Sequence, residues 1–188
     1  KTYWWYANHT MIFCSYDYEL SQDDTQYIYD TYKQDRFLRP GDGSYYTGYH
    51  THPLSTARYK TEKFDDKKIV TMYSSFLAKC LREQGYPMED SILSYNHIWA
   101  QIYLKEKGSK NAPHNHYISK EVCSWIHFVN VPDDQDCLYF QIGDTKVYPK
   151  EQRSGKLIFF PSWALHGVDP ITTTNERVVV AGNIIKLL

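Results

Sequence analysis

The hydrophobic pattern changes to a period of two near Ser91, and this change limits the fold more than any other feature of the chain. In the segment 97–105, HIWAQIYLK, apolar side chains alternate with polar and aromatic ones, which predicts a strand with two different faces. The apolar face would carry Ile98, Ala100, Ile102 and Leu104, and the polar, aromatic face Trp99, Gln101, Tyr103 and Lys105. Further strands are predicted at 122–132, 137–142, 155–161 and 176–184. We therefore expect a mainly β protein with flanking helices (α+β), built as a jelly roll.

The first ninety residues carry helical and turn patterns instead. Ser21 followed by Asp24 predicts a helix N-cap with a carboxylate at the third helical position. A second helix is predicted to start after residue 65 or 66 and to stop at Gly85 and Pro87, with apolar residues three and four apart between them. The segment 39–55 is punctuated by glycine and proline, which predicts loop or irregular strand. We expect one domain, 1–188, in which residues 1–90 support and partly cover a β core formed by residues 91–188.

Composition argues against several classes of function. A chain of 188 residues that is 42% hydrophobic and 23% charged has the profile of one compact soluble domain. Its net charge of −1 gives no basic surface for nucleic acid. No run approaches the roughly 18 apolar residues that a membrane span needs. The 18 tyrosines and 5 tryptophans suit strand surfaces, pocket walls and subunit contacts such as those of a homodimer.

The cysteines predict a reducing environment. They stand at positions 14, 80, 123 and 137 and form no C-x-x-C pair, which argues against a zinc ribbon or a redox pair. We expect free thiols, buried as small apolar residues, and a cytoplasmic protein. The chain begins at Lys1 with neither an initiator methionine nor a signal-peptide pattern, which is typical of a processed or trimmed chain.

Two histidines one residue apart, His114 and His116 in APHNHYIS, are the first candidate metal ligands. Taken alone, a pair at this spacing is more often two polar surface residues than a metal site, so a metal site needs a third ligand downstream. His166 is the candidate, because FFPSWALHGVDP places it in the turn after an apolar strand. From such a position a rigid sheet can direct a side chain into a cavity.

The last predicted strand opens with Arg177. By strand alternation its side chain shares a face with Val179, Ala181 and Asn183, so it points inward if they do. The other histidines have less specific surroundings. His50 and His52 repeat the one-residue spacing without a downstream motif and are predicted to be loop residues. His97 and His127 lie within predicted strands and are expected to be core or cavity-wall residues.

Four motifs occur in the order in which a known enzyme superfamily has them. They are PHNH (113–116), SWIHFVNVP (124–132), GKLIFFPSWALHGVDP (155–170) and ERVVVAGNI (176–184). In this order they resemble the iron(II)- and 2-oxoglutarate-dependent dioxygenases, in particular their prolyl-hydroxylase-like branch, over residues 91–188. The resemblance implies a double-stranded β-helix in which His114, His116 and His166 bind Fe(II), leaving positions for 2-oxoglutarate and O2.

The resemblance also implies a cosubstrate site. Arg177 would bind the distal carboxylate of 2-oxoglutarate, because a guanidinium offers a bidentate fork that matches a planar carboxylate. Tyr103 would donate its hydroxyl to the same carboxylate, and Asn183 would line the cavity.

His116 departs from the commonest form of the motif, which has a carboxylate at this position. A third neutral imidazole would leave the site one negative charge short. Three alternatives follow: His116 is a true ligand, a nearby carboxylate such as Asp169 replaces it, or the site has only two histidines. We favour the first.

The implied activity is hydroxylation of a C–H bond in a peptidyl, prolyl-like substrate or in a small molecule. The aromatic residues of the first half would form a lid or a substrate groove; they include Trp4, Trp5, Tyr45, Tyr46 and Tyr49. Two other functions remain open. One is a catalytically silent jelly-roll module whose histidines hold zinc or nothing, and the other is a cupin-like dioxygenase with three histidines that uses no 2-oxoglutarate.

Overall fold

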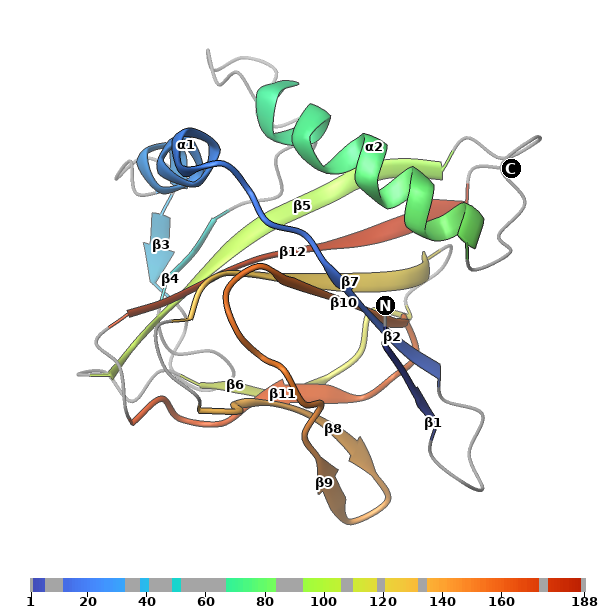
Figure 1. The fold of residues 1–188 in the computed structure, drawn as a ribbon. Helices are drawn as coiled ribbons and strands as arrows, with labels where there is room; N and C mark the ends of the chain where they lie inside the picture. The colour runs from blue at the N-terminus through green and yellow to red at the C-terminus, as the bar shows by residue number, and fades with distance from the viewer. Residues whose placement is uncertain are drawn as a thin grey trace.

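The computed structural model describes residues 2–5, 12–32, 38–40, 49–51, 67–83, 93–105, 110–117, 121–131, 135–172 and 176–186. In these residues two antiparallel sheets face each other, and two helices cover the outer face of the larger sheet (Figure 1). The predicted jelly roll with flanking helices is thus confirmed. None of the helices that the structure describes is long and apolar enough to cross a membrane.

The larger sheet has eight strands in the order β1-β2-β10-β7-β12-β5-β4-β3. Their bounds are β1 Thr2–Trp5, β2 Ile12–Asp17, β10 Lys156–Pro161, β7 Glu121–Asn130, β12 Glu176–Lys186, β5 Leu93–Leu104, β4 Tyr49–Thr51 and β3 Leu38–Pro40. The second sheet has the order β6-β11-β8-β9. Its strands are β6 Asn111–His114, β11 His166–Val168, β8 Leu138–Ile142 and β9 Thr145–Val147.

Strand alternation divides the core into two parts, one on each face of the larger sheet. On β12, Val178 and Val180 pack with the helices, whereas Val179 and Ala181 pack between the sheets. β5 alternates in the same way, with Ile98, Ala100 and Ile102 on the helix side and Tyr103 between the sheets. The space between the sheets is therefore lined by the face of β12 that was predicted to carry Arg177 and Asn183.

The two helices begin where they were predicted to begin. The second helix buries side chains three and four residues apart, as its apolar spacing predicted. α1 (Gln22–Tyr32) is capped by Ser21, whose Oγ accepts a hydrogen bond of 3.1 Å from the backbone N–H of Asp24. α2 (Lys67–Glu83) lies across β5 and β12 (Figure 1). Its fully buried side chains are Ile69, Tyr73, Leu77, Cys80 and Leu81. Cys14, Cys80, Cys123 and Cys137 are all buried, and none of these four forms a disulfide.

The expectation of helices and loops for residues 1–90 was incomplete. This part of the chain also supplies four strands, β1 and β2 beside β10 at one edge of the larger sheet, and β3 and β4 beside β5 at the other. The strands β6, β9 and β11 were not predicted either. Trp4 and Trp5 lie in β1 and Tyr49 in β4, whereas Tyr45 and Tyr46 lie outside the described residues. The aromatic lid therefore stays a prediction.

Candidate metal centre

Three histidines from two distant segments of the chain meet between the two sheets. His114 ends β6, His166 begins β11, and the two residues stand opposite each other in the antiparallel pairing of these strands. His116 follows two residues after His114. The candidate ligand nitrogens of all three lie within 4.8 Å of one another, and nitrogens at right angles about one ion would be about 3 Å apart. The predicted third ligand is therefore in place, although it opens a short strand and does not lie in a turn.

Backbone carbonyls orient two of the three imidazoles. Nδ1 of His114 lies 2.9 Å from the carbonyl oxygen of Ala112, and Nδ1 of His166 lies 2.9 Å from that of Ala164. A carbonyl only accepts, so each Nδ1 carries the proton and each Nε2 is the deprotonated nitrogen. Metal-binding histidines in proteins are usually held by such a hydrogen bond, because it fixes the ring and its tautomer.

The third imidazole, His116, is placed by different contacts. Its backbone N–H donates to the carbonyl of Ser162 over 2.9 Å, which ties residues 115–117 to the turn before β11. Its Nδ1 lies 3.4 Å from Nδ2 of Asn183 on β12. Its ring centroid is 5.6 Å from that of Trp99 on β5. Two strands of the larger sheet, together with the turn before β11, therefore position this histidine.

Burial favours the neutral form of two of the histidines, His166 and His114. His166 is 3% exposed, and its ring centroid is 4.7 Å from that of Phe160. Burial, together with His114 and His116 nearby, lowers the pKa of His166 well below the ordinary histidine value. Burial also lowers the pKa of His114, and its hydrogen bond to Ala112 opposes that shift only in part. Metal ligation requires the neutral form, so the lowered pKa values of these two residues favour binding of a cation.

Among the described residues, the cluster consists of His114, His116 and His166 and contains no carboxylate. Asp169, the alternative ligand considered from the sequence, accepts hydrogen bonds from Lys146 over 2.6 Å and from Tyr148. Its carboxylate is therefore bonded to Lys146 and Tyr148 and is not a member of the histidine cluster. The structure supports the alternative with three histidines and not the one in which Asp169 replaces His116.

Unsatisfied polar atoms also mark this region. The cavity beside the histidines has a volume of about 20 Å³, about enough for one water molecule. Asn111, which lines it, is 5% exposed, and its Oδ1 is buried without a hydrogen-bond partner. The carbonyl of Ser162 accepts a hydrogen bond from the backbone N–H of His116, whereas Oγ of Ser162 is buried without a hydrogen-bond partner. Buried polar atoms are rarely left unpaired, so a polar group bound at the histidines would suit this cavity.

Arg177 and Tyr103 lie together in a separate part of the interior. They are paired residues of β12 and β5, and their side chains are 2% and 1% exposed. The guanidinium of Arg177 donates to the carbonyl of Gln135 over 2.8 Å and to Oε1 of Gln152 over 3.0 Å. The Tyr103 hydroxyl donates to Oε1 of Gln101 over 2.9 Å, and Gln101 lines the cavity at the histidines. Gln101 therefore lies between the two groups of predicted site residues.

Gln152 was missed by the sequence analysis. It is 3% exposed, and its Oε1 accepts from the backbone N–H of Leu138 as well as from Arg177. Its Nε2 donates to the carbonyls of Leu138 and Pro149. A single glutamine in a turn gives no sequence signal for such a role.

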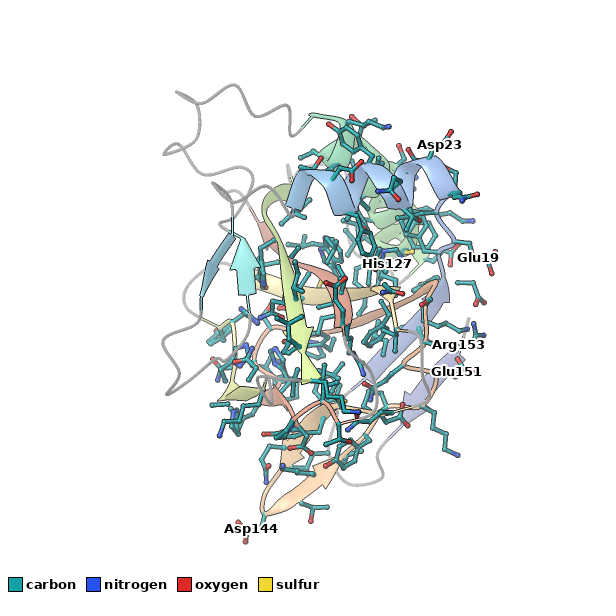
Figure 2. The ribbon with its side chains drawn as sticks, turned by 90° about the vertical axis from the view of Figure 1, so that its left-hand side faces the viewer. Glu19, Asp23, His127, Asp144, Glu151 and Arg153 are labelled. Atoms are coloured by element: carbon teal, nitrogen blue, oxygen red, sulfur yellow. The ribbon has the colours of Figure 1, made fainter. Side chains whose placement is uncertain are left out.

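The remaining histidines lie elsewhere. His127 is a core residue, as expected; it is 1% exposed and lies below α1 on the helix side of the larger sheet (Figure 2). His50 lies in β4, so its prediction as a loop residue was wrong, and His52 lies outside the described residues. His97 lies in β5, as expected.

Comparison with known proteins identifies the fold. No protein-family model matches the chain, and no curated protein matches it significantly. Among solved structures, a Pseudomonas putida prolyl-4-hydroxylase is similar with a TM-score of 0.66 and 14% identity over 95% of each chain.

Two further structures agree. A Trichoplax adhaerens prolyl hydroxylase, solved with a peptide fragment of the hypoxia-inducible factor oxygen degradation domain, has a TM-score of 0.66 and 13% identity over 92% of this chain and 83% of its own. A 2OG-Fe(II) oxygenase family oxidoreductase from Burkholderia pseudomallei has a TM-score of 0.67 and 10% identity over 92% and 84%. At such identities the likeness shows the fold, and the chain has the jelly-roll fold of the prolyl hydroxylases and 2OG-Fe(II) oxygenases, as the order of its motifs predicted.

Proposed function

We propose that this protein is an oxygenase that depends on Fe(II) and 2-oxoglutarate and hydroxylates a C–H bond. The observation that carries the proposal is the convergence of His114, His116 and His166 in the interior of this fold. Imidazole is a suitable ligand for Fe(II), and three protein ligands leave coordination positions for other groups. When bound, the metal and 2-oxoglutarate would supply the activation of O2, with succinate and CO2 as coproducts.

The protein's own residues would bind and orient these groups. His114 and His166 are held by backbone carbonyls, and their neutral state favours a cation over a proton. The rings of Phe140 and Phe160 lie beside His166 and keep bulk water from its inner side. The unpartnered Oδ1 of Asn111 would accept a hydrogen bond from a group at the metal.

Arg177 and Tyr103 would hold the distal carboxylate of 2-oxoglutarate. Both are buried, and a buried guanidinium is a strong partner for a carboxylate. A cavity of about 20 Å³ is smaller than a five-carbon diacid. We therefore expect side chains between the histidines and Arg177, Gln101 among them, to move when the cosubstrate binds.

A peptide is the substrate class that we propose first. The Trichoplax relative in fold was solved with a peptide fragment. Among the described residues, large exposed apolar side chains include Tyr117, 65% exposed, and Trp163, 47% exposed. Each lies within three residues of a candidate ligand, His116 or His166, so we propose both as contacts for a substrate chain. A small molecule of similar chemistry remains the alternative.

A second candidate is a dioxygenase with three histidines that binds its substrate at the metal without 2-oxoglutarate. It is favoured by the absence of a carboxylate from the cluster and by the hydrogen bonds from Arg177 to Gln135 and Gln152. The two candidates predict different roles for Arg177.

The test is to add Fe(II) and 2-oxoglutarate to the protein without oxygen and then to admit air. We expect a weak visible charge-transfer band, followed by succinate, and neither in the His166→Ala variant. The Arg177→Lys variant should bind 2-oxoglutarate about tenfold or more weakly, because lysine lacks the bidentate fork. The matched control is Arg153→Ala, since Arg153 lies at the surface, where it forms an ion pair with Asp17 (Figure 2). A wild type that binds iron but gives neither band nor succinate would contradict the use of 2-oxoglutarate.

A further inference from the structure

The structure assigns Asn183, backed by Ser124, a positioning role: we propose that this pair allows His116 to change from the tautomer seen here, in which Nδ1 accepts from Nδ2 of Asn183, to the tautomer that can bind a metal through Nε2. The inference rests on the proposed metal site and adds to it the means by which its third ligand is set. His116 differs from the other two imidazoles in the group that Nδ1 contacts. His114 and His166 each donate Nδ1–H to a backbone carbonyl, whereas Nδ1 of His116 faces a side-chain amide.

The geometry joins three side chains in a row. Oγ of Ser124 donates to Oδ1 of Asn183 over 2.8 Å, and Nδ2 of Asn183 lies 3.4 Å from Nδ1 of His116. Ser124 and Asn183 are opposite residues of β7 and β12, which fixes their separation. They are 1% and 8% exposed, so water has little access to replace either contact. Both strands belong to the larger sheet, whereas His116 follows a strand of the second.

An amide and a carbonyl differ in what they allow the imidazole to do. A carbonyl accepts only, so His114 and His166 have one tautomer. The amide of Asn183 can present either its NH2 or its oxygen to His116. With NH2 toward His116, Nδ1 must accept, and a neutral ring then has its proton on Nε2. With the oxygen toward His116, Nδ1–H donates and Nε2 is deprotonated.

Ser124 tolerates both orientations of the amide. A hydroxyl can donate to Oδ1, as it does in the structure, and it can accept from Nδ2 after the amide rotates by half a turn. Among small uncharged side chains, a hydroxyl such as that of serine or threonine can take both roles. Binding of a metal at Nε2 of His116 therefore requires the amide oxygen to face Nδ1, and the Ser124 hydroxyl makes this reversal possible without an unpaired buried group.

The test is the affinity of the full chain for Co(II) and for Zn(II), each added alone and measured by competition with a chromophoric chelator. Asn183→Leu removes the acceptor while nearly preserving shape, and we expect it to weaken binding about tenfold or more, as loss of an outer-shell partner does. Asn183→Asp keeps an acceptor toward Nδ1–H, and we expect binding at least as tight as in the wild type. In a His116→Ala background, Asn183→Leu should change the affinity no further.

These outcomes separate positioning from packing and from the proposed function. Equal binding by wild type and Asn183→Leu, or equal losses in Asn183→Leu and Asn183→Asp, would overturn the inference while leaving the metal site intact. If the leucine variant does not fold, as judged by thermal unfolding without metal, the aspartate variant decides, and weaker binding than wild type overturns the inference. A wild type that binds neither ion would overturn the inference and the proposed function together.

Discussion

His127 and His166 are both buried, but in different parts of the core: His127 lies on the helix face of the larger sheet, and His166 lies between the two sheets. His127, on the helix face, has a partner at each nitrogen: the Tyr73 hydroxyl at 2.7 Å and the carbonyl of Tyr18 at 2.9 Å. His166, between the sheets, is bonded to a carbonyl through Nδ1 and faces two further imidazoles. Burial lowers the pKa of both residues. A buried neutral histidine therefore indicates a candidate ligand only when a nitrogen is directed at other donors.

The largest expected effect comes from removing the two histidines in turn. His166→Ala should weaken Co(II) binding by more than about 100-fold, because it removes a ligand and not an outer-shell partner. His127→Leu should leave Co(II) affinity unchanged and lower the free energy of unfolding by about 1–3 kcal/mol for each polar group left unpaired. Chelator competition and urea unfolding measure the two quantities. Loss of metal binding in His127→Leu would contradict the proposal that only the histidines between the sheets bind the metal.

Acid should destabilise the helix face through His127. Burial lowers its pKa from 6.5 to about 4, so between these values the unfolded chain binds a proton that the folded chain does not. The free energy of unfolding should therefore fall as the pH falls from 6.5 to about 4, by about 3 kcal/mol for this group. Urea unfolding across that range, in wild type and His127→Leu, isolates the contribution. An equal decline in both proteins would show that His127 is not its source.

Gly167, between His166 and Val168, should be sensitive to any side chain. A Cβ there would lie 2.6 Å from the Tyr139 hydroxyl oxygen and 2.9 Å from the carbonyl oxygen of Asn111. Gly167→Ala should cost about 1–3 kcal/mol of unfolding free energy, and it should weaken Co(II) binding because β11 carries His166. The matched control is Gly143→Ala, where no atom lies within 4 Å and only the φ of +57° adds strain. Metal binding that falls equally in both variants would contradict this account.

The smallest effect is expected at Asp169. Its ion pair with Lys146 is partly exposed, and pairs of this kind contribute about 0–1 kcal/mol. Asp169→Asn should therefore leave metal affinity unchanged and alter the free energy of unfolding by less than about 1 kcal/mol. A large loss of Co(II) affinity would restore Asp169 as a ligand and limit the role of His116.

The sequence predicted the parts of the molecule in which spacing alone carries information. Long strand patterns predicted β5, β7 and β12. The order of the histidines and Arg177 predicted that His166 and Arg177 would be directed into the interior, where both are buried. The strands β6, β9 and β11 have only three or four residues, too few for a periodic pattern to be visible.

Other features depend on register between distant strands. The contact of Asn183 with Ser124 exists because β12 and β7 pair at these two residues, and the contact of Gln152 with Arg177 depends on how a turn folds back. Neither follows from local pattern. The same limit applies to β2 and β4, whose partners β10 and β5 are distant in the chain.

The most direct measurement is X-ray absorption spectroscopy of the chain loaded with one equivalent of Co(II), which counts imidazole ligands by their multiple scattering. The account predicts three imidazoles in the wild type and two in His116→Ala. A carboxylate among the protein ligands, or a spectrum that His116→Ala leaves unchanged, would contradict it.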